Sequence, residues 1–166
     1  MKIYDDKHIK NIALLGAPKS GKTLLAEDML FEAGIIHRRG TIEGKNTISD
    51  YHEIEQERGN SVFATPLHTE WKDYKINIID TPGLDDFAGE MIASLRVSDT
   101  CVMVINASHG VEVGTDIIWD YTEQFKTPML IAVNKLDEAT ADFEKTIHEA
   151  KSHFGPNVVA IQYPVN

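Results

Sequence analysis

The sequence predicts an α/β fold, in which a mostly parallel six-stranded sheet carries helices on both faces. Two observations support this prediction. Apolar runs typical of buried strands alternate along the chain with segments of helical period. Three short polar strings also follow such runs, at points where loops leave the carboxyl ends of strands. This alternation implies right-handed crossover connections, which place helices over both faces of the sheet.

The first half of the chain begins with an apolar run at Lys10–Gly16, which indicates a buried strand. A helix is expected over Lys22–Ala33, where small and apolar residues share one face and Gly34 can end the helix. The next segment, Gly40–Asn60, is polar and has no clean period, so it is expected to be a loop or a mobile segment.

An antiparallel hairpin is expected next, because two strand-like runs flank the short turn at Lys72 and Asp73. The second half then alternates regularly, and Gly155 followed by Pro156 predicts the end of its last helix. The hairpin strands are Ser61–Trp71 and Tyr74–Asp80, the later strands are Cys101–Asn106, Pro128–Asn134 and Asn157–Tyr163, and the later helices are Glu90–Val97, Val113–Phe125 and Ala141–Phe154.

Size and composition are those of one soluble domain. The chain has 166 residues, of which 42% are hydrophobic and 25% charged. No apolar run approaches the roughly 18 to 20 residues of a membrane span. The formal net charge of −10 argues against non-specific binding of DNA, which requires clustered Lys and Arg. The single cysteine, Cys101, excludes a disulfide within the chain and favours a cytoplasmic setting.

The string GAPKSGKT at Gly16–Thr23 has the spacing of a phosphate-binding loop between a strand and a helix. Gly16 and Gly21 allow backbone amides to turn toward phosphate oxygens, and the following helix N-terminus adds positive charge. Lys22 would stabilise charge on the β- and γ-phosphates, while Thr23 would bind Mg²⁺. The string alone does not distinguish ATP from GTP. The loop residues assigned to the nucleotide are Gly16, Lys19, Ser20, Gly21, Lys22 and Thr23.

The string DTPG at Asp80–Gly83 follows the apolar run INIID. A carboxylate at the end of a strand beside a phosphate loop can hold Mg²⁺ through water, which is the role expected for Asp80. Gly83 can offer its amide to a γ-phosphate. In isolation DTPG would be only a favourable turn, so the expectation depends on the phosphate loop that precedes it.

The string NKLD at Asn134–Asp137 indicates which base is bound. Asp137 can accept two hydrogen bonds from the N1–H and N2–H₂ edge of guanine, a pattern that adenine lacks. Asn134 would hold the base side of the pocket, and the aliphatic stem of Lys135 can lie over the ring. The sequence therefore predicts a pocket for GTP or GDP with Mg²⁺, and disfavours an unrelated ATPase or kinase.

With these residues in place, the chain resembles the GTP-binding domain of translational GTPases, and that of elongation factor G in particular. Glu55–Val62 is similar to the first switch of that family and Ile76–Phe87 to its second switch. The resemblance implies that Ser61 binds Mg²⁺ and that Gln162, in Ala160–Asn166, lies near the base. It covers the chain from about Ile9 to Asn166.

Three positions depart from the family pattern. Leu84 stands where the family has a histidine that orients the attacking water, and leucine has no donor or acceptor. No catalytic base is therefore assigned, and hydrolysis is expected to be impaired. Ser61 stands where the family has threonine, and Lys19 where it has an aspartate thought to hold a monovalent cation. Lys19 either supplies that charge itself or simply faces solvent.

The predicted function is GTP-dependent ribosome binding by an elongation-factor-G-like translation factor, with GTP hydrolysis weakened at Leu84. Two alternatives remain open: a GTP-binding switch that does not hydrolyse, and a ribosomal protection factor of the tetracycline-resistance type. Residues 1–166 are expected to form one monomeric GTP-binding domain at the N-terminus of a longer cytoplasmic protein, with the ribosome as partner and no contact with membranes.

Overall fold

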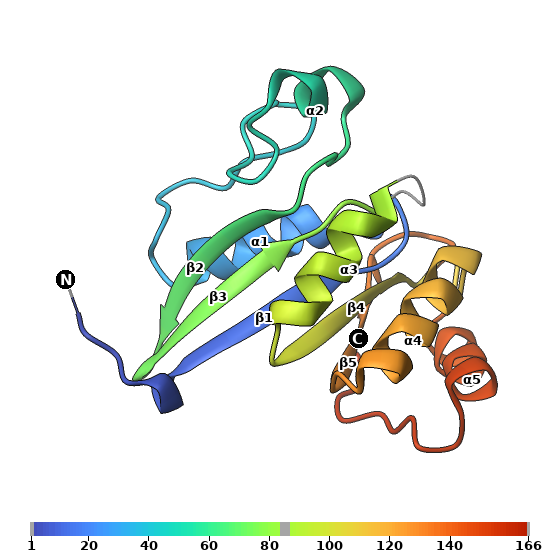
Figure 1. The fold of residues 1–166 in the computed structure, drawn as a ribbon. Coiled ribbons are helices and arrows are strands. Elements are labelled where there is room, and N and C mark those ends of the chain that lie inside the picture. Colours follow the sequence, from blue (N-terminus) through green and yellow to red (C-terminus); the bar gives the residue numbers. More distant parts are fainter. Residues whose placement is uncertain (1, 84–86, 166) are drawn as a thin grey trace.

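The computed structural model describes residues 2–83 and 87–165, and these residues form one sheet with helices packed on both faces. The strand order is β2-β3-β1-β4-β5, in which only β2 runs antiparallel to its neighbour (Figure 1). The strands are β1 (Ile9–Leu15), β2 (Thr65–Trp71), β3 (Tyr74–Asp80), β4 (Thr100–Asn106) and β5 (Met129–Asn134). The predicted α/β class with a mostly parallel sheet is confirmed.

The helices alternate with the strands as the sequence indicates. Figure 1 shows α1 on one face of the sheet and α3, α4 and α5 on the other, with α2 above the edge of the sheet. The helices are α1 (Lys22–Glu32), α2 (Glu53–Arg58), α3 (Ala88–Val97), α4 (Val113–Phe125) and α5 (Phe143–Phe154), preceded by the 3₁₀ turn η1 (Asp6–His8). No helix in the described part of the chain combines the length and apolar character needed to cross a membrane.

Strand β1 is buried on both faces, and its alternate side chains belong to different cores. Ala13 and Leu15 pack with α3, α4 and α5, whereas Leu14 packs with Ile78 and α1. This arrangement follows from the period of two in a strand, which sends successive side chains to opposite faces. The helices beyond β4 are joined by a stacked pair, Trp119 on Phe154, with ring centroids 4.9 Å apart.

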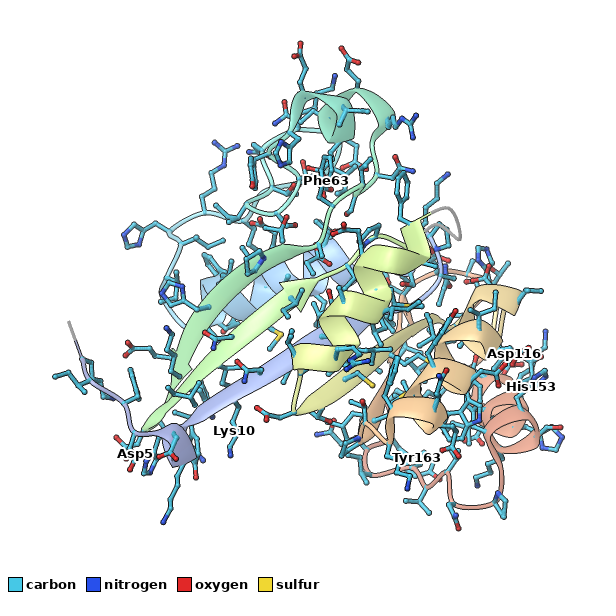
Figure 2. The ribbon with its side chains drawn as sticks, in the orientation of Figure 1. Asp5, Lys10, Phe63, Asp116, His153 and Tyr163 are labelled. Atoms are coloured by element: carbon cyan, nitrogen blue, oxygen red, sulfur yellow. The ribbon has the colours of Figure 1, made fainter. Side chains whose placement is uncertain are left out.

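Helices α4 and α5 are also linked at their surface. Asp116 Oδ1 of α4 lies 3.0 Å from His153 Nδ1 of α5 (Figure 2). Both side chains are about half exposed, so this pair contributes little to stability. The apolar contacts beneath it, rather than the pair itself, hold the two helices together.

The predicted sixth strand at Asn157–Tyr163 is wrong, because the sheet of the described residues ends at β5. Val159 is 72% exposed and Ile161 78% exposed, so these apolar side chains do not pack against the sheet. The apolar run Val158–Ile161 favours a strand, but strand propensity acts mainly through packing on neighbours. Without that packing the segment remains irregular.

The expectation of a loop over Gly40–Asn60 is wrong in part, because helix α2 lies within it. This helix is too short to show a helical period in the sequence. It ends at Gly59, whose φ of 67° is left-handed and whose amide donates to Glu55 O at 2.8 Å. The predicted strand that follows also begins later, at Thr65 rather than Ser61.

Candidate functional site

The three polar strings meet at one edge of the sheet, where parallel strands end together. Leu14 of β1 is in register with Asp80 of β3, and Asn106 of β4 with Asn134 of β5. The loops that follow these strand ends therefore emerge side by side. This is the edge at which ligands bind in open α/β sheets.

Two glycines of the phosphate loop are required by their surroundings. Gly16 has a φ of 147°, and a Cβ there would lie 2.3 Å from the backbone oxygen of Val104. Gly21 has a φ of 100°, and its Cβ would lie 2.3 Å from Nδ2 of Asn134. Both conformations are rare for residues with side chains. The loop can therefore turn tightly over the end of β1 while NKLD packs against it.

Lys22 is held at the centre of this loop. Its Nζ donates to the backbone oxygens of Gly16 at 3.0 Å and Ala17 at 2.9 Å, and the residue is only 6% exposed. Burial lowers the pKa of Lys22 to about 8. Gly83 lies directly over it, since a Cβ there would be 2.6 Å from Lys22 Nζ. An anion bound in the loop would favour the charged form of Lys22 and so oppose the effect of burial on its pKa.

A cluster of hydroxyls surrounds Asp80. Thr23 Oγ1 donates to Asp80 Oδ2 at 2.8 Å, and Ser49 Oγ donates to the same oxygen at 2.7 Å. Ser61 Oγ lies 3.2 Å from Thr23 Oγ1. Burial raises the pKa of Asp80, and its Oδ1 is buried with no partner among the described residues. The three residues assigned to Mg²⁺ from the sequence thus lie together.

Asp50 adds a second buried carboxylate that sequence reasoning missed. It is 5% exposed, and neither of its oxygens has a hydrogen-bond partner among the described residues. Burial raises the pKa of Asp50 to about 6. Neither Ser49 nor Asp50 belongs to a motif recognised in the sequence, and they lie in the segment expected to be an irregular loop. Only the fold places them beside Asp80.

These oxygens fit a hard divalent cation. Mg²⁺ prefers carboxylate, hydroxyl, water and phosphate oxygens. Asp50 and Asp80 together present buried carboxylate oxygens without partners among the described residues, and Thr23 and Ser61 place hydroxyls next to them. Such unpaired buried anions are costly unless a cation compensates them.

Residues 40–64, which we call the strap, carry Ser49, Asp50 and Ser61 to the site. A buried glutamate on α1 anchors one part of the strap, because Glu27 accepts hydrogen bonds from the amides of Gly40, at 2.9 Å, and Ile48. Glu27 is 2% exposed. The early part of the strap is therefore fixed to the helix that follows the phosphate loop.

Two further glutamates anchor the end of the strap. Glu55 of α2 is 1% exposed and accepts from the amides of Val62 at 2.9 Å and Phe63 at 3.1 Å. Glu90 of α3 accepts from the amide of Ala64 at 2.9 Å. The protein itself thus holds the strap over the strand ends, and Figure 2 shows Phe63 on this raised segment.

A cavity of about 400 Å³ lies between the phosphate loop and the strap. Seven of the predicted site residues line it, and so do Asp50 and Asn60, which were not predicted. Lys19 is exposed at its rim with a φ of 62°. The predicted residues that line the cavity are Lys19, Gly21, Lys22, Thr23, Ser61, Gly83 and Lys135.

The NKLD string lies against the phosphate loop. Asn134 Nδ2 donates to Ser20 O at 3.0 Å, so its amide ties the two loops together. Lys135 has a φ of 59°, and its Nζ donates to Glu138 Oε1 at 3.0 Å. Asp137, one residue beyond Leu136, is exposed and does not line the cavity. This exposure leaves its carboxylate accessible to a base.

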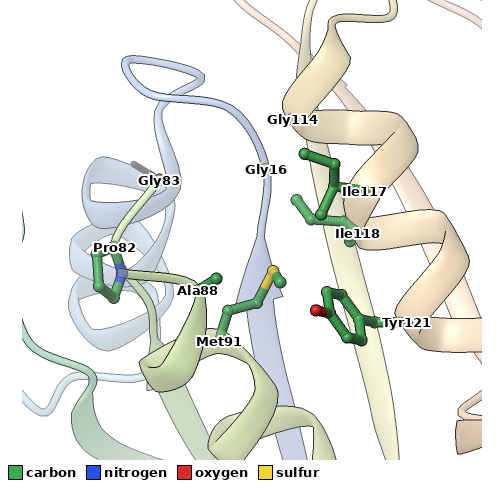
Figure 3. A pocket seen from close by; sticks show the side chains of 9 residues that line it. All are labelled: Gly16, Pro82, Gly83, Ala88, Met91, Gly114, Ile117, Ile118 and Tyr121. Carbon is green, nitrogen blue, oxygen red and sulfur yellow. The ribbon is translucent and has the colours of Figure 1, made fainter. Parts of the chain in front are cut away.

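Two predicted residues remain outside this arrangement. Gln162 is exposed and does not line the cavity; it lies in the segment that forms no strand. Leu84 lies outside the described residues, so its predicted effect on hydrolysis stays a prediction. Gly16 instead lines a smaller apolar groove between α3 and α4, with Met91 and Tyr121 among its other walls (Figure 3).

The fold and this site define a nucleotide-binding α/β domain with a phosphate loop. The chain belongs to the family described as Elongation factor Tu GTP binding domain, whose sequence profile matches residues 7–163. The resemblance to the GTP-binding domains of translational GTPases is thereby confirmed, and with it a guanine-nucleotide ligand.

Individual relatives agree with this assignment. The chain is 40% identical over 162 residues to Ribosome-releasing factor 2, mitochondrial, of Drosophila melanogaster, covering 98% of the chain and 22% of that protein. It is 35% identical to elongation factor G of Petrotoga mobilis, covering 99% of the chain and 24% of that protein. The crystal structure of a protein from Thermus thermophilus matches 90% of the chain and 22% of its own with a TM-score of 0.86 and 31% identity. The chain thus spans about a quarter of the length of these relatives.

Proposed function

We propose that this chain is the GTP- and Mg²⁺-binding domain of an elongation-factor-G-like translation factor that binds ribosomes in its GTP state. The observation that carries the proposal is the cavity lined by Lys22, Thr23, Ser61 and the buried Asp50, whose carboxylate lacks hydrogen-bond partners among the described residues. A second buried carboxylate, Asp80, accepts a hydrogen bond from Thr23 at the side of this cavity. The ribosome as partner is inferred from the relatives, which are named elongation factor G and ribosome-releasing factor. We expect it to act in the cytoplasm.

Each residue has a defined task in this proposal. Lys22 offers an ammonium to the β- and γ-phosphates, and the loop amides between Gly16 and Thr23 surround their oxygens. Thr23 and Ser61 would hold Mg²⁺ directly, while Asp80 and Asp50 would hold it through water. The metal, when bound, would neutralise charge on the phosphates. Asp137 would accept the two donors of the guanine edge, which gives the pocket its preference over adenine.

Hydrolysis of GTP is expected to be slow. A group that orients the attacking water must lie within hydrogen-bond reach, and leucine at position 84 has neither donor nor acceptor. The sequence at this position therefore favours a second candidate function, a GTP-dependent switch. Such a switch would be released by nucleotide exchange rather than by GTP hydrolysis. Such a switch needs only a difference in affinity between its two states for GTP and GDP.

Two measurements on the full-length protein test the proposal. Fluorescent GTP and GDP should bind in the micromolar range or tighter and ATP should not compete, whereas equal competition by ATP would refute the guanine pocket. Single-turnover GTP hydrolysis should then be compared with and without ribosomes. Slow but ribosome-stimulated turnover supports the first candidate. GTP-dependent ribosome binding with no turnover supports the switch.

A further inference from the structure

The reacting water needs a polar partner that the recognised motifs do not supply. In phosphoryl transfer to water, a side chain orients the nucleophile, and in some GTPases this side chain is an amide. Leu84 cannot do so, since it lacks polar atoms. The inference below rests on the proposed hydrolysis and concerns which residue holds this water.

Two polar residues that line the cavity, Glu43 and Asn60, have no assigned role, and of these Glu43 is exposed. Asn60 is the one with a buried polar atom. Its Oδ1 is buried and has no hydrogen-bond partner among the described residues. The residue lines the same cavity as Lys22, Thr23 and Gly83, which surround the expected γ-phosphate position. A buried amide oxygen without a partner is costly, and native structures usually supply one as water or ligand. The cavity is where such a partner would sit.

The backbone around Asn60 is fixed on both sides. Gly59 ends α2 with a hydrogen bond to Glu55, and Glu55 also holds the amides of Val62 and Phe63. The next residue, Ser61, contacts Thr23 of the phosphate loop through its hydroxyl. Asn60 therefore lies between two anchored points, and its side chain is held beside the phosphate loop. Such restraint is what a positioning group requires.

Asn60 differs from the acidic residues near it in being uncharged. Asp50 and Asp80 also have oxygens without partners among the described residues, but a cation is needed to compensate their buried charge. A carboxylate facing the γ-phosphate without a cation would also repel it. A neutral amide holds water beside a polyanion without that cost, and its carbonyl can accept a proton of the water in a hydrogen bond.

We propose that Asn60 orients the water that attacks the γ-phosphate. The water oxygen forms the new bond to phosphorus as the bond to the β–γ bridging oxygen breaks. GDP leaves with that electron pair, and the water proton passes to a phosphate oxygen. The products are GDP and inorganic phosphate. Asn60 accepts a hydrogen bond and is not itself protonated, because an amide is too weakly basic to take the proton.

Replacement of Asn60 by leucine, which is of similar size but apolar, tests the proposal in the full-length protein. Single-turnover GTP hydrolysis with ribosomes should fall at least tenfold. The expected loss can be smaller than the roughly 10²- to 10⁴-fold of proton-transfer groups, because Asn60 only positions the water. The dissociation constant for GTP should change less than threefold. Affinity for GDP with aluminium fluoride, which resembles the transition state, should fall with the rate. Asn157→Ala, in an exposed turn, is the matched control and should change nothing.

The outcomes separate this inference from the proposed function. Unchanged hydrolysis and unchanged aluminium fluoride affinity in Asn60→Leu would overturn the role of Asn60 while leaving the GTPase intact. Weaker binding of GTP by the variant, in proportion to the lost rate, would assign Asn60 to ground-state binding and overturn the role equally. If the unaltered protein binds GTP but never hydrolyses it, the inference fails and the switch remains. If it does not bind GTP, the proposed function fails.

Discussion

The anchoring of the strap by Glu55 can be tested quantitatively. Glu55 is 1% exposed, and it accepts from the amides of Val62, Phe63 and, at 3.3 Å, His52. Glu55→Ala removes the acceptor from all three amides. Leaving a buried donor unsatisfied costs about 1–3 kcal/mol, and partly solvated donors cost less. Only the bond to Val62 lies in fully buried surroundings, so we expect a loss of about 2–4 kcal/mol, confined to the strap.

Hydrogen exchange at the Val62 amide measures this loss. The strap can open without unfolding the core, so exchange reports its local stability. A loss of about 2 kcal/mol predicts roughly 30-fold faster exchange, since each 1.4 kcal/mol is a factor of about ten. Glu55→Gln retains one acceptor oxygen and should give an intermediate value.

The matched control is Glu57→Ala, which removes an exposed glutamate from the same helix. It should leave the Val62 exchange rate within about twofold, because exposed substitutions usually change stability by under ~0.5 kcal/mol. Equal exchange rates in the two alanine variants would refute the anchoring role. So would acceleration throughout the sheet, which would mean that Glu55 stabilises the whole domain rather than the strap.

Four further predictions concern the base, the water and the core. Asp137→Asn should weaken GTP binding and strengthen xanthosine triphosphate binding, because the amide donates where the carboxylate accepted; unchanged GTP affinity would contradict the base assignment. Leu84→His should raise ribosome-stimulated single-turnover hydrolysis at least tenfold at unchanged GTP affinity, and an unaltered rate would show that position 84 does not limit the reaction. Burial raises the pKa of Cys101 from 9.0 to about 12, so the native thiol should react with maleimide at pH 8 far more slowly than in urea. The raised pKa also means that the folded state holds this proton more tightly than the unfolded state does. The contribution of Cys101 to the free energy of unfolding should therefore be lost as the pH rises from 9 toward 12, which urea titrations at several pH values would measure.

Local signals predicted most of the fold correctly. The strand at β1, the phosphate loop and helix α1 follow in the expected order, because an apolar run, a glycine-rich turn and a helical period are each encoded within a few residues. The strand predicted at Asn157–Tyr163 is wrong because its formation depends on residues outside the segment. Its apolar run is a local signal, but a strand needs a neighbouring strand to pair with, and this segment leaves Val159 and Ile161 exposed.

By itself the sequence predicted the ligand class, because the spacings within Gly16–Thr23 and Asn134–Asp137 are typical of a phosphate loop and of guanine recognition, and the two strings occur together in that order. The tertiary structure decided which other groups share the cavity. Asp50 belongs to no motif, and Asn60 lies in the switch-like segment Glu55–Val62 without an assigned role. Both became candidates only when the strap placed them in the cavity with Lys22. Their burial depends on contacts between residues far apart in the chain, and neither composition nor periodicity contains that information.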